Sequence, residues 1–371
     1  MPIQPIKRLN TKVLIVGGGP AGSTAATVLA QNGVDCLLLE KNRSRTKPCG
    51  GGLAISAFEE FDLPKGSITN TVQHLRIISP RGERVDIDLK NQNLAIVDRK
   101  EFDEVLRRKA ELQGARILEG EFLRVLPAKK CRIDALIENK KVQITSEYLI
   151  AADGVNSRVR ASLGIKPSQS LLTLSEKLPG PLIDHCEFWF GASHAPRSYS
   201  WVFPATEGLS VGTAAFEPRR LNNLLQNFKG RAGLLPNGRK KAYPIPVWEG
   251  TLYHRQNILF AGDAAGQVLP LSYEGIYYAM KSGELAAQAL LKEQVGLYKK
   301  MWKSRFQKRF LMLKKLEHFF LKNDALAEKM VQLHNIPEVQ AASLMIWLGR
   351  DNRRHGLLHY VRLFGKYLTK T

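Results

Sequence analysis

The stretch Val13-Leu-Ile-Val-Gly17-Gly18-Gly19-Pro20-Ala21-Gly22 joins a short apolar segment to a G-x-G-x-x-G motif. The apolar segment predicts a buried strand, and the Ala-rich residues 23–32 predict a helix. In such a strand–turn–helix unit, Gly17 permits the tight turn, Gly19 lets a pyrophosphate approach the backbone, and Gly22 lets helix and strand pack closely. Free N–H groups at the start of the helix meet the phosphates. The stretch therefore predicts a dinucleotide site.

The next predicted strand, residues 36–40, ends in Glu40. A carboxylate at this point can accept hydrogen bonds from both hydroxyl groups of a ribose, and it repels a 2′-phosphate. A glycine-rich turn without a ligand is the alternative, but it does not account for the strand, the helix and the acidic residue together. The residues expected to contact the nucleotide are Gly17, Gly19, Pro20, Ala21, Gly22, Glu40 and Lys41.

The chain has 371 residues, enough for one large domain or two interlocked ones, and its 44% hydrophobic and 24% charged composition is ordinary for a globular protein. No apolar run approaches the roughly 20 residues of a membrane span, and residues 1–10 lack the apolar core of a secretory signal. Four cysteines without CxxC spacing give no sign of an oxidising compartment. We expect a cytoplasmic protein.

The α/β pattern recurs twice along the chain, and strand-rich segments lie between its occurrences. The recurrences are a helix over 98–114 with a strand over 148–152, and a strand over 258–261 with a helix near 275–292; the strand-rich segments are 72–96 and 171–247. We expect one α/β domain interrupted by a mostly antiparallel one. The predicted bounds are 1–70, 98–165 and 250–295 for the nucleotide-binding domain, 71–97 and 166–249 for a substrate domain, and 296–371 for a helical C-terminal region.

Three further segments resemble those of FAD-binding proteins. Residues 261–266, with Gly262 and Asp263, are similar to the second FAD fingerprint of the glutathione-reductase-like flavoproteins, whose Asp contacts the ribityl chain. The other two segments resemble the aromatic-hydroxylase branch of these proteins: Asp153-Gly154 resembles its DG motif, and Arg99 lies in a segment similar to the one placed against FAD. The resemblance implies FAD as the cofactor, in a Rossmann-type FAD-binding domain interleaved with a mostly antiparallel β domain.

The loop Lys47-Pro-Cys-Gly-Gly-Gly52 follows the second predicted strand and would run toward the flavin ring. Its glycines let the backbone approach a flat ring, and we expect Cys49, Gly50 and Gly51 to contact the cofactor. A thiol here could deliver or relay a proton. Cys49 could instead be a small space-filling residue beside the flavin.

On this loop and two other features, the chain resembles the geranylgeranyl reductase family over residues 11–290. One feature is Tyr199-Ser-Trp201-Val-Phe-Pro204, similar to the family's Y-x-W-x-F-P segment on the substrate side; the other is Pro270 to Ile276, similar to its proline-to-EGI stretch beside the flavin, with Gly275 and Ile276 at the cofactor. The chain departs from the family at Ser272-Tyr273, where a Thr/Ser-Gly pair is expected, and at Ala205-Thr206, where a Lys is common.

The resemblance implies an FAD-dependent reductase of carbon–carbon double bonds in an isoprenoid or similar hydrophobic substrate. Reduced FAD would give a hydride from N5 to one alkene carbon, and an acid would protonate the other. Cys49, Tyr199 and Trp201 are the predicted catalytic residues. Phe203 lies on the same strand face, as substrate contact or as ordinary aromatic core.

Two other functions remain open at this point. A flavin monooxygenase or halogenase shares the fold and the DG motif, but it would consume oxygen. A non-catalytic flavin protein that docks on membranes would bind FAD without substrate-dependent reoxidation. The electron donor is either NADPH, bound transiently because no second G-x-G-x-x-G domain occurs, or a reduced ferredoxin-like protein suited to a basic surface.

The formal net charge is +21, and residues 296–371 carry 16 Lys+Arg against 5 Asp+Glu. From Leu297 onward an apolar stripe recurs at steps of three and four: Trp302, Phe306, Phe310, Leu313, Leu316 and Phe320. This pattern, and a second basic-aromatic segment over 352–370, fits either a helical lid or peripheral contact with the inner face of an anionic membrane. No nucleic-acid motif accompanies the charge. His355 and His359 lack a third ligand, so no metal is expected.

Overall fold

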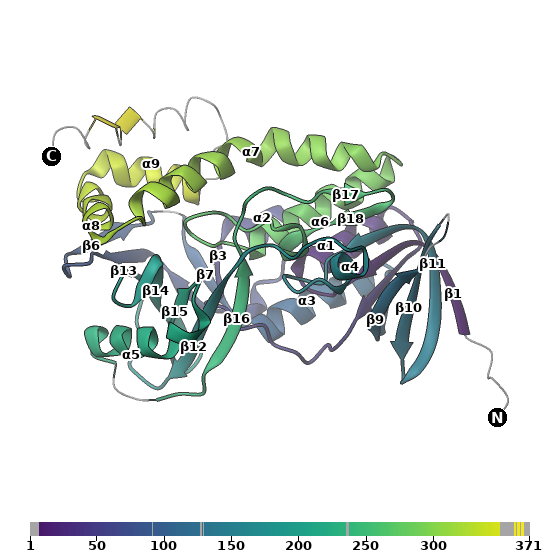
Figure 1. The fold of residues 1–371 in the computed structure, drawn as a ribbon, viewed down its shortest axis with the longest axis horizontal. Helices are drawn as coiled ribbons and strands as arrows, with labels where there is room; N and C mark the ends of the chain where they lie inside the picture. The colour runs from purple at the N-terminus through teal and green to yellow at the C-terminus, as the bar shows by residue number, and fades with distance from the viewer. Residues whose placement is uncertain are drawn as a thin grey trace.

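In the computed structural model, the described residues are 7–90, 92–126, 128, 130–234, 237–348, 360, 362–363 and 365–366. Figure 1 shows two sheet-based halves side by side along the long axis, and helix α7 (Val295–Phe320) runs along one side of both. Parallel and antiparallel strands occur together with packed helices. The predicted α/β fold class is therefore confirmed.

The first sheet has the Rossmann-type arrangement, with the order β17-β18-β11-β1-β2-β8. Strands β18, β11, β1, β2 and β8 run parallel to one another, whereas β17 is antiparallel to β18, and β9 and β10 extend β11 as antiparallel strands. The strand bounds are β1 Lys7–Val16, β2 Cys36–Glu40, β8 Arg116–Glu119, β9 Glu121–Leu126, β10 Cys131–Ile137, β11 Lys140–Ala151, β17 His254–Arg255 and β18 Ile258–Phe260.

The last four residues of strand β1, 13–16, are buried on both faces of the sheet, which explains their continuous apolar run. Val13 and Ile15 pack in the cluster that contains helices α1 (Pro20–Gln31), α3 (Arg99–Leu112) and α6 (Ile276–Leu291). Leu14 and Val16 face the other side, where they meet side chains of β9, β10 and helix α4 (Arg158–Ser162). Since β1 ends between these layers, the loop that begins at Gly17 opens at the carboxyl edge of the sheet.

The second sheet has the order β16-β12-β15-β14-β13-β5-β6, and a small sheet, β3-β7-β4, lies between it and the first. The bounds are β5 His74–Ile78, β6 Arg84–Asp88, β12 Ser170–Leu178, β13 His185–Gly191, β14 Ala195–Ala205, β15 Gly208–Ala215 and β16 Lys241–Pro246, with β3 Gly52–Ala54, β4 Ile68–Val72 and β7 Leu94–Val97 in the small sheet. The strand-rich segment 72–96 is thus divided between two sheets. The domain bounds given above stay a prediction.

Helix α5 (Leu221–Ala232) lies within a segment that we predicted as strand-rich. Its buried residues Leu221, Leu224, Leu225 and Phe228 follow the helical period and pack against the second sheet. This spacing is visible in the sequence, so the helix could have been found there. Short helical elements elsewhere are α2 (Ser56–Glu60), η1 (Lys65–Ser67), η2 (Pro218–Arg220) and η3 (Gly262–Ala265).

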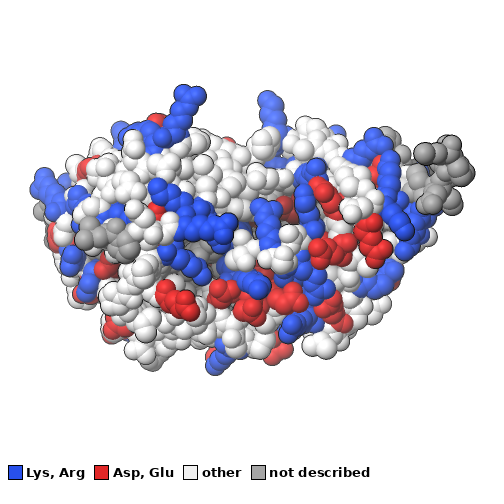
Figure 2. Space-filling model, turned by 90° about the horizontal axis from the view of Figure 1, so that it is seen from below, with Lys and Arg blue, Asp and Glu red and all other residues white. Residues whose placement is uncertain are grey.

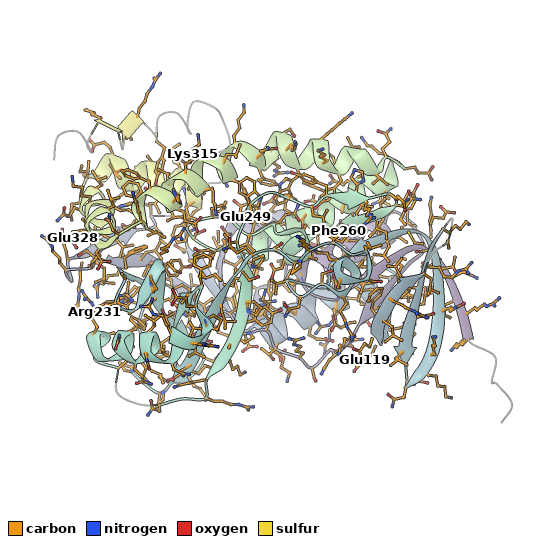
Figure 3. The ribbon with its side chains drawn as sticks, viewed as in Figure 1. Glu119, Arg231, Glu249, Phe260, Lys315 and Glu328 are labelled. Atoms are coloured by element: carbon orange, nitrogen blue, oxygen red, sulfur yellow. The ribbon has the colours of Figure 1, made fainter. Side chains whose placement is uncertain are left out.

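The described C-terminal region is helical, as predicted, with α7 followed by α8 (Asp324–Leu333) and α9 (Pro337–Trp347). The predicted stripe of α7 is mostly buried: Trp302 and Phe310 pack edge-on against Tyr278 of α6, and Phe310 also contacts Trp248. Lys315 remains exposed on this helix (Figure 3). The lid alternative therefore describes α7, and membrane contact stays a prediction.

Carboxylates of helix α8 attach it to the second sheet: Asp324 accepts a hydrogen bond from the Ala192 amide at 2.7 Å, and Glu328 makes two more. Glu328, labelled in Figure 3, accepts hydrogen bonds from the Ser79 hydroxyl and the Arg81 amide, both at 2.9 Å. On the face shown in Figure 2, basic and acidic side chains are interspersed, so the excess positive charge does not form one patch there. Among the described residues, the structure has no helix with the length and apolar character needed to cross a bilayer.

Candidate FAD and substrate site

The glycine-rich turn has the geometry that a dinucleotide requires. Gly17 has a φ of +102°, and a Cβ there would lie 2.4 Å from the Ala152 carbonyl oxygen. A Cβ on Gly22 would lie 1.9 Å from the Gly17 oxygen, so strand and helix could not approach as they do. A Cβ on Gly19 would instead have no atom within 4 Å. Gly19 is the N-cap of α1 and supplies no side-chain cap, so the first-turn amides face an open space suited to a phosphate.

Glu40 stands beside this turn, as predicted. Its carboxylate accepts hydrogen bonds from the Gly18 amide at 2.5 Å and from the Asn42 amide at 2.9 Å. Arg107 of α3, which the sequence argument missed, donates to the Gly18 oxygen at 3.1 Å. Lys41 pairs with Glu121 at the rim, 2.8 Å apart, and its side chain is largely exposed.

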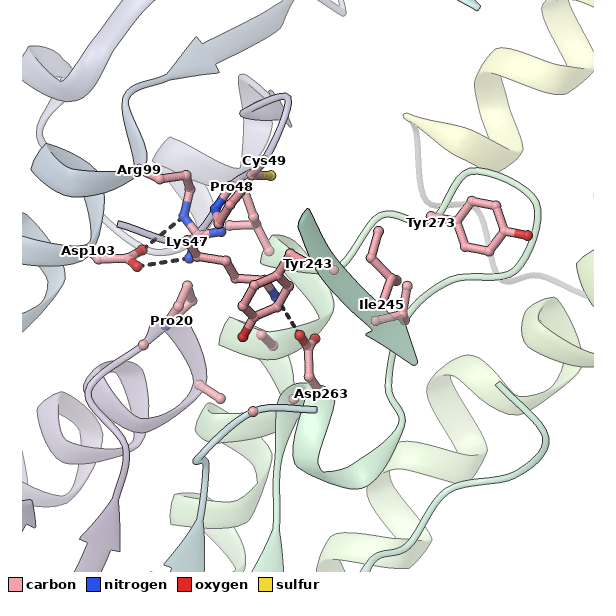
Figure 4. Close-up of a pocket in the computed structure, with 18 of the residues that line it drawn as sticks. Pro20, Lys47, Pro48, Cys49, Arg99, Asp103, Tyr243, Ile245, Asp263 and Tyr273 are labelled. Atoms are coloured by element: carbon pink, nitrogen blue, oxygen red, sulfur yellow. Dashed lines mark hydrogen bonds and ion pairs between the residues drawn. The ribbon is translucent and has the colours of Figure 1, made fainter. Parts of the chain in front are cut away.

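A cavity of about 630 Å³ connects the glycine-rich turn with the second sheet. It is lined by all but one of the predicted cofactor and catalytic residues: Gly17, Gly19, Pro20, Ala21, Glu40, Lys41, Cys49, Gly50, Gly51, Arg99, Asp153, Gly154, Tyr199, Trp201, Gly262, Asp263, Gly275 and Ile276. The exception, Gly22, packs beneath the turn. Figure 4 shows residues of both halves facing one another across this space. The structure brings the predicted set together, and the role of each residue stays a prediction.

Arg99 and Cys49 both line the cavity and lie near each other (Figure 4). The Arg99 guanidinium is buried and forms a two-pronged ion pair with Asp103, with N–O distances of 3.1 and 2.8 Å. Burial opposes its charge, but Asp103 and the Cys49 side chain beside it outweigh that effect and raise the pKa of Arg99. Arg99 is therefore a permanent cation next to the exposed thiol.

The Cys49 loop is packed closely on the aromatic strand β14. A Cβ on Gly50 would lie 2.7 Å from the ring of Phe203, and Gly51 has a φ of +80° with Val97 against it. The Gly51 amide points at the Cys49 sulfur, 3.4 Å away. These contacts explain two of the three glycines, because a side chain at Gly50 or Gly51 would displace Cys49.

Aromatic side chains of the second sheet line the cavity beside the Cys49 loop. Tyr199, Trp201 and Phe203 of β14 all line it, and Phe188 of β13 packs edge-on against both Tyr199 and Phe203, with ring centroids 5.2 Å apart. Trp347 at the end of α9, 5.9 Å from Phe188, closes this wall. Burial raises the pKa of Tyr199, and its hydroxyl donates to the Ser272 carbonyl at 2.6 Å. This wall of the cavity is therefore largely aromatic.

The departure at Ser272-Tyr273 has a structural consequence. Leu271 and Tyr273 have φ values of +71° and +52°, in the left-handed region that glycine occupies without strain. The expected glycine at the second position of the pair fits this backbone, whereas here Tyr273 adopts it. The tyrosine gains a partner, because its hydroxyl donates to Glu317 of α7 at 2.7 Å.

The carboxylates of Asp153 and Asp263 have different partners. The Asp153 carboxylate accepts from the Ser157 hydroxyl at 2.6 Å and from the Val159 amide at 3.1 Å, so its side chain is directed to the start of α4. Burial raises the pKa of Asp153 despite these bonds. The Asp263 carboxylate instead pairs with Lys47, 2.5 Å away across the cavity.

Lys47 and Asp103 stand in sequence motifs without a predicted role, and Tyr243 and Trp347 were not predicted at all. Asp103 could have been found, because Arg99 and Asp103 are four residues apart on a predicted helix. Tyr243 and Trp347 carried no comparable signal. His355, His359 and most of the segment 352–370 lie outside the described residues. Within the described ranges, no group of three potential metal ligands occurs.

Comparison with known proteins agrees with this geometry. Residues 10–296 match the family model described as an FAD binding domain. The chain is 30% identical over 361 residues to the geranylgeranyl diphosphate reductase of Rhodobacter capsulatus, and the match covers 91% of each chain. The chain belongs to the geranylgeranyl reductase family of FAD-binding proteins. It is an FAD-dependent oxidoreductase, and the open phosphate cradle at Gly19 fits this cofactor.

Two other family members extend the comparison. The digeranylgeranylglycerophospholipid reductase of Methanocaldococcus jannaschii is 30% identical over 326 residues, which cover 79% of this chain and 82% of the relative. The solved structure of a geranylgeranyl bacteriochlorophyll reductase-like protein from Thermoplasma acidophilum superimposes with a TM-score of 0.82 at 25% identity, covering 96% of this chain and all of that one. The family resemblance predicted from the motifs is confirmed.

Proposed function

We propose that this protein reduces carbon–carbon double bonds of a geranylgeranyl-type isoprenoid or a similar hydrophobic alkene. The observation that carries the proposal is that the Cys49 thiol and an aromatic wall line the same cavity as the FAD-binding turn. Family members are named for reduction of geranylgeranyl diphosphate and of a digeranylgeranyl lipid, which supports an isoprenoid substrate.

The reaction adds a hydride to one alkene carbon and a proton to the other, which converts the double bond into a single bond. FAD, when bound and reduced, supplies the hydride. Cys49 is the proposed proton source, positioned by the Gly50 and Gly51 backbone beside the Arg99 cation. Without a carbonyl to accept charge, the alkene acquires positive character as it reacts. The ring faces of Tyr199 and Trp201 would stabilise that charge and exclude water.

The test is anaerobic. The flavin of the purified protein is reduced with dithionite, geranylgeranyl diphosphate or a geranylgeranyl lipid is added, and absorbance of the oxidised flavin is followed. We expect reoxidation and a product heavier by two hydrogens per reduced bond. Comparison of the two substrates identifies the head group.

The main alternative, a monooxygenase or halogenase, makes the opposite prediction. Reduced flavin would stay reduced with every alkene under anaerobic conditions, and it would react only when oxygen is admitted with an aromatic substrate. The glycine-rich Cys49 loop, which lines the cavity, favours the reductase. The same assay identifies the electron donor, because NADPH and a reduced ferredoxin can each replace dithionite.

A further inference from the structure

Lys47 holds an ammonium group inside the cofactor cavity. It lies in the loop between β2 and β3, two residues before Cys49, and its Nζ is 2.5 Å from the Asp263 carboxylate. The same Nζ lies 4.8 Å from the centre of the Tyr243 ring, a distance typical of a cation–π contact. Figure 4 shows Lys47 reaching from the Cys49 loop toward Asp263, with Tyr243 alongside.

The charge of Lys47 persists at neutral pH. Burial disfavours an ammonium, but the Asp263 carboxylate and Tyr243 outweigh that effect and raise the pKa of Lys47 above its ordinary value of 10.5. Only 28% of its side chain and 9% of that of Asp263 are exposed. Water therefore screens this pair weakly, and its electrostatic effect on neighbouring groups exceeds that of a surface pair.

A flavin changes charge when it is reduced. Two electrons and one proton enter the ring at neutral pH, so that the reduced form carries one negative charge more than the oxidised form. A fixed cation in the cavity binds that form more tightly, and a fixed anion binds it less tightly. The N-terminus of α6 at Gly275 also borders the cavity and adds partial positive charge there.

We propose that Lys47 and Asp263 form a charge pair that sets the reduction potential of the bound FAD, with Lys47 favouring the reduced cofactor and Asp263 opposing it. The proposal rests on FAD binding and not on the identity of the alkene. It gives the lysine of the Lys47–Gly52 loop a role separate from that of Cys49: Cys49 acts on the substrate, whereas Lys47 acts on the electron equilibrium.

The direction in which each variant changes the reduction potential of FAD distinguishes this role from a structural one. Removing either partner breaks the ion pair and loosens the Cys49 loop, so a purely structural role moves both variants in the same direction. Under the proposal, Lys47→Met removes the cation and lowers the potential. Asp263→Asn leaves the cation uncompensated and raises the potential.

The experiment measures the midpoint potential of FAD in the full chain by spectroelectrochemistry, together with the dissociation constants of oxidised and reduced FAD. Lys47→Met should weaken binding of reduced relative to oxidised FAD by about tenfold, which is about 30 mV for a two-electron couple. Asp263→Asn should change that ratio in the opposite direction, and Lys47→Arg should stay near the wild type. Lys12→Met is the matched control, because Lys12 forms an exposed pair with Glu293.

Two results would overturn the proposal: an unchanged ratio of the two dissociation constants in Lys47→Met, or shifts of the same sign in Lys47→Met and Asp263→Asn. A variant that binds FAD weakly still gives the ratio, since each redox state is titrated separately. Lys47→Gln, which keeps a hydrogen-bond donor but loses the charge, must change the ratio of the two dissociation constants in the same direction as Lys47→Met. Failure of the alkene assay would leave these potentials interpretable, so the two proposals are tested independently.

Discussion

The hydroxyl of Tyr273 donates a 2.7 Å hydrogen bond to Glu317, and this bond ties the loop before α6 to the C-terminal helix α7. The loop lines the cavity, and Tyr273 holds a left-handed backbone conformation that costs free energy for a non-glycine residue. The bond and the burial of Tyr273 offset that cost. A residue that departs from the family pattern thereby couples α7 to the cofactor site.

Replacing Tyr273 with Phe should lower the free energy of unfolding by about 1–3 kcal/mol, because the buried carboxylate of Glu317 loses a donor. Urea unfolding of the full chain measures the change. Glu317→Gln retains an oxygen acceptor and should cost less than Tyr273→Phe. Equal stability of Tyr273→Phe and the wild type would show that the bond does not hold the loop.

Gly50→Ala should separate cofactor binding from catalysis. The new Cβ would lie 2.7 Å from Phe203, so either the ring or the Cys49 loop must move. We expect bound FAD by absorbance but a turnover reduced by about 100-fold, since a misplacement of 1 Å can cost that much. Adding Phe203→Val makes room and should restore part of the rate. If Gly50→Ala is fully active, the packing of this loop does not position Cys49.

Cys49→Ala tests the proposed proton source directly. The variant should keep FAD, because the glycine-rich turn is untouched, and alkene reduction should slow by roughly 10²–10⁴-fold, the usual contribution of a positioned acid. Single-turnover reoxidation of reduced flavin is the measurement. Cys186→Ala is the matched control, since that thiol is buried in the second sheet and does not line the cavity. An unchanged rate in Cys49→Ala would leave Cys49 with a space-filling role.

Much of this site could be predicted from the sequence, because its backbone geometry requires particular residue types at fixed spacings. Gly17, Gly19 and Glu40 were predicted from their spacing, since a dinucleotide site requires glycines for the phosphates and an acidic residue for the ribose at fixed intervals. Arg99 and Asp263 required the resemblance to flavoproteins. Trp347 and Tyr243 could not be predicted, because they come from elements whose approach to the cavity depends on how the two sheets pack. No local pattern encodes that packing.

Breaking the buried ion pair Arg99–Asp103 should destabilise the protein strongly, whereas removing both partners together should not. Arg99→Leu leaves the Asp103 carboxylate buried without its cation, and we expect a loss of about 3–5 kcal/mol in the free energy of unfolding. The double variant Arg99→Leu/Asp103→Leu should recover much of this loss, because no uncompensated charge remains. Arg116→Leu, which breaks the exposed pair with Asp35, should cost less than about 1 kcal/mol. A single variant no less stable than this control would contradict the expectation.

Buried tyrosines should make the protein labile to alkali. Burial raises the pKa values of Tyr199, Tyr273, Tyr298 and Tyr360, that of Tyr360 to about 12. In the unfolded chain these phenols lose their protons near pH 10, whereas the folded protein keeps them. Above pH 10 the unfolded state therefore binds fewer protons, and the free energy of unfolding falls as pH rises, by about 1.4 kcal/mol per pH unit for each phenol.

Tyr298→Phe should reduce this slope by one phenol's share, although its hydrogen bond to Phe260 is also lost. Unfolding curves between pH 9 and 11.5 measure both slopes, and equal slopes would mean that Tyr298 ionises normally in the folded protein.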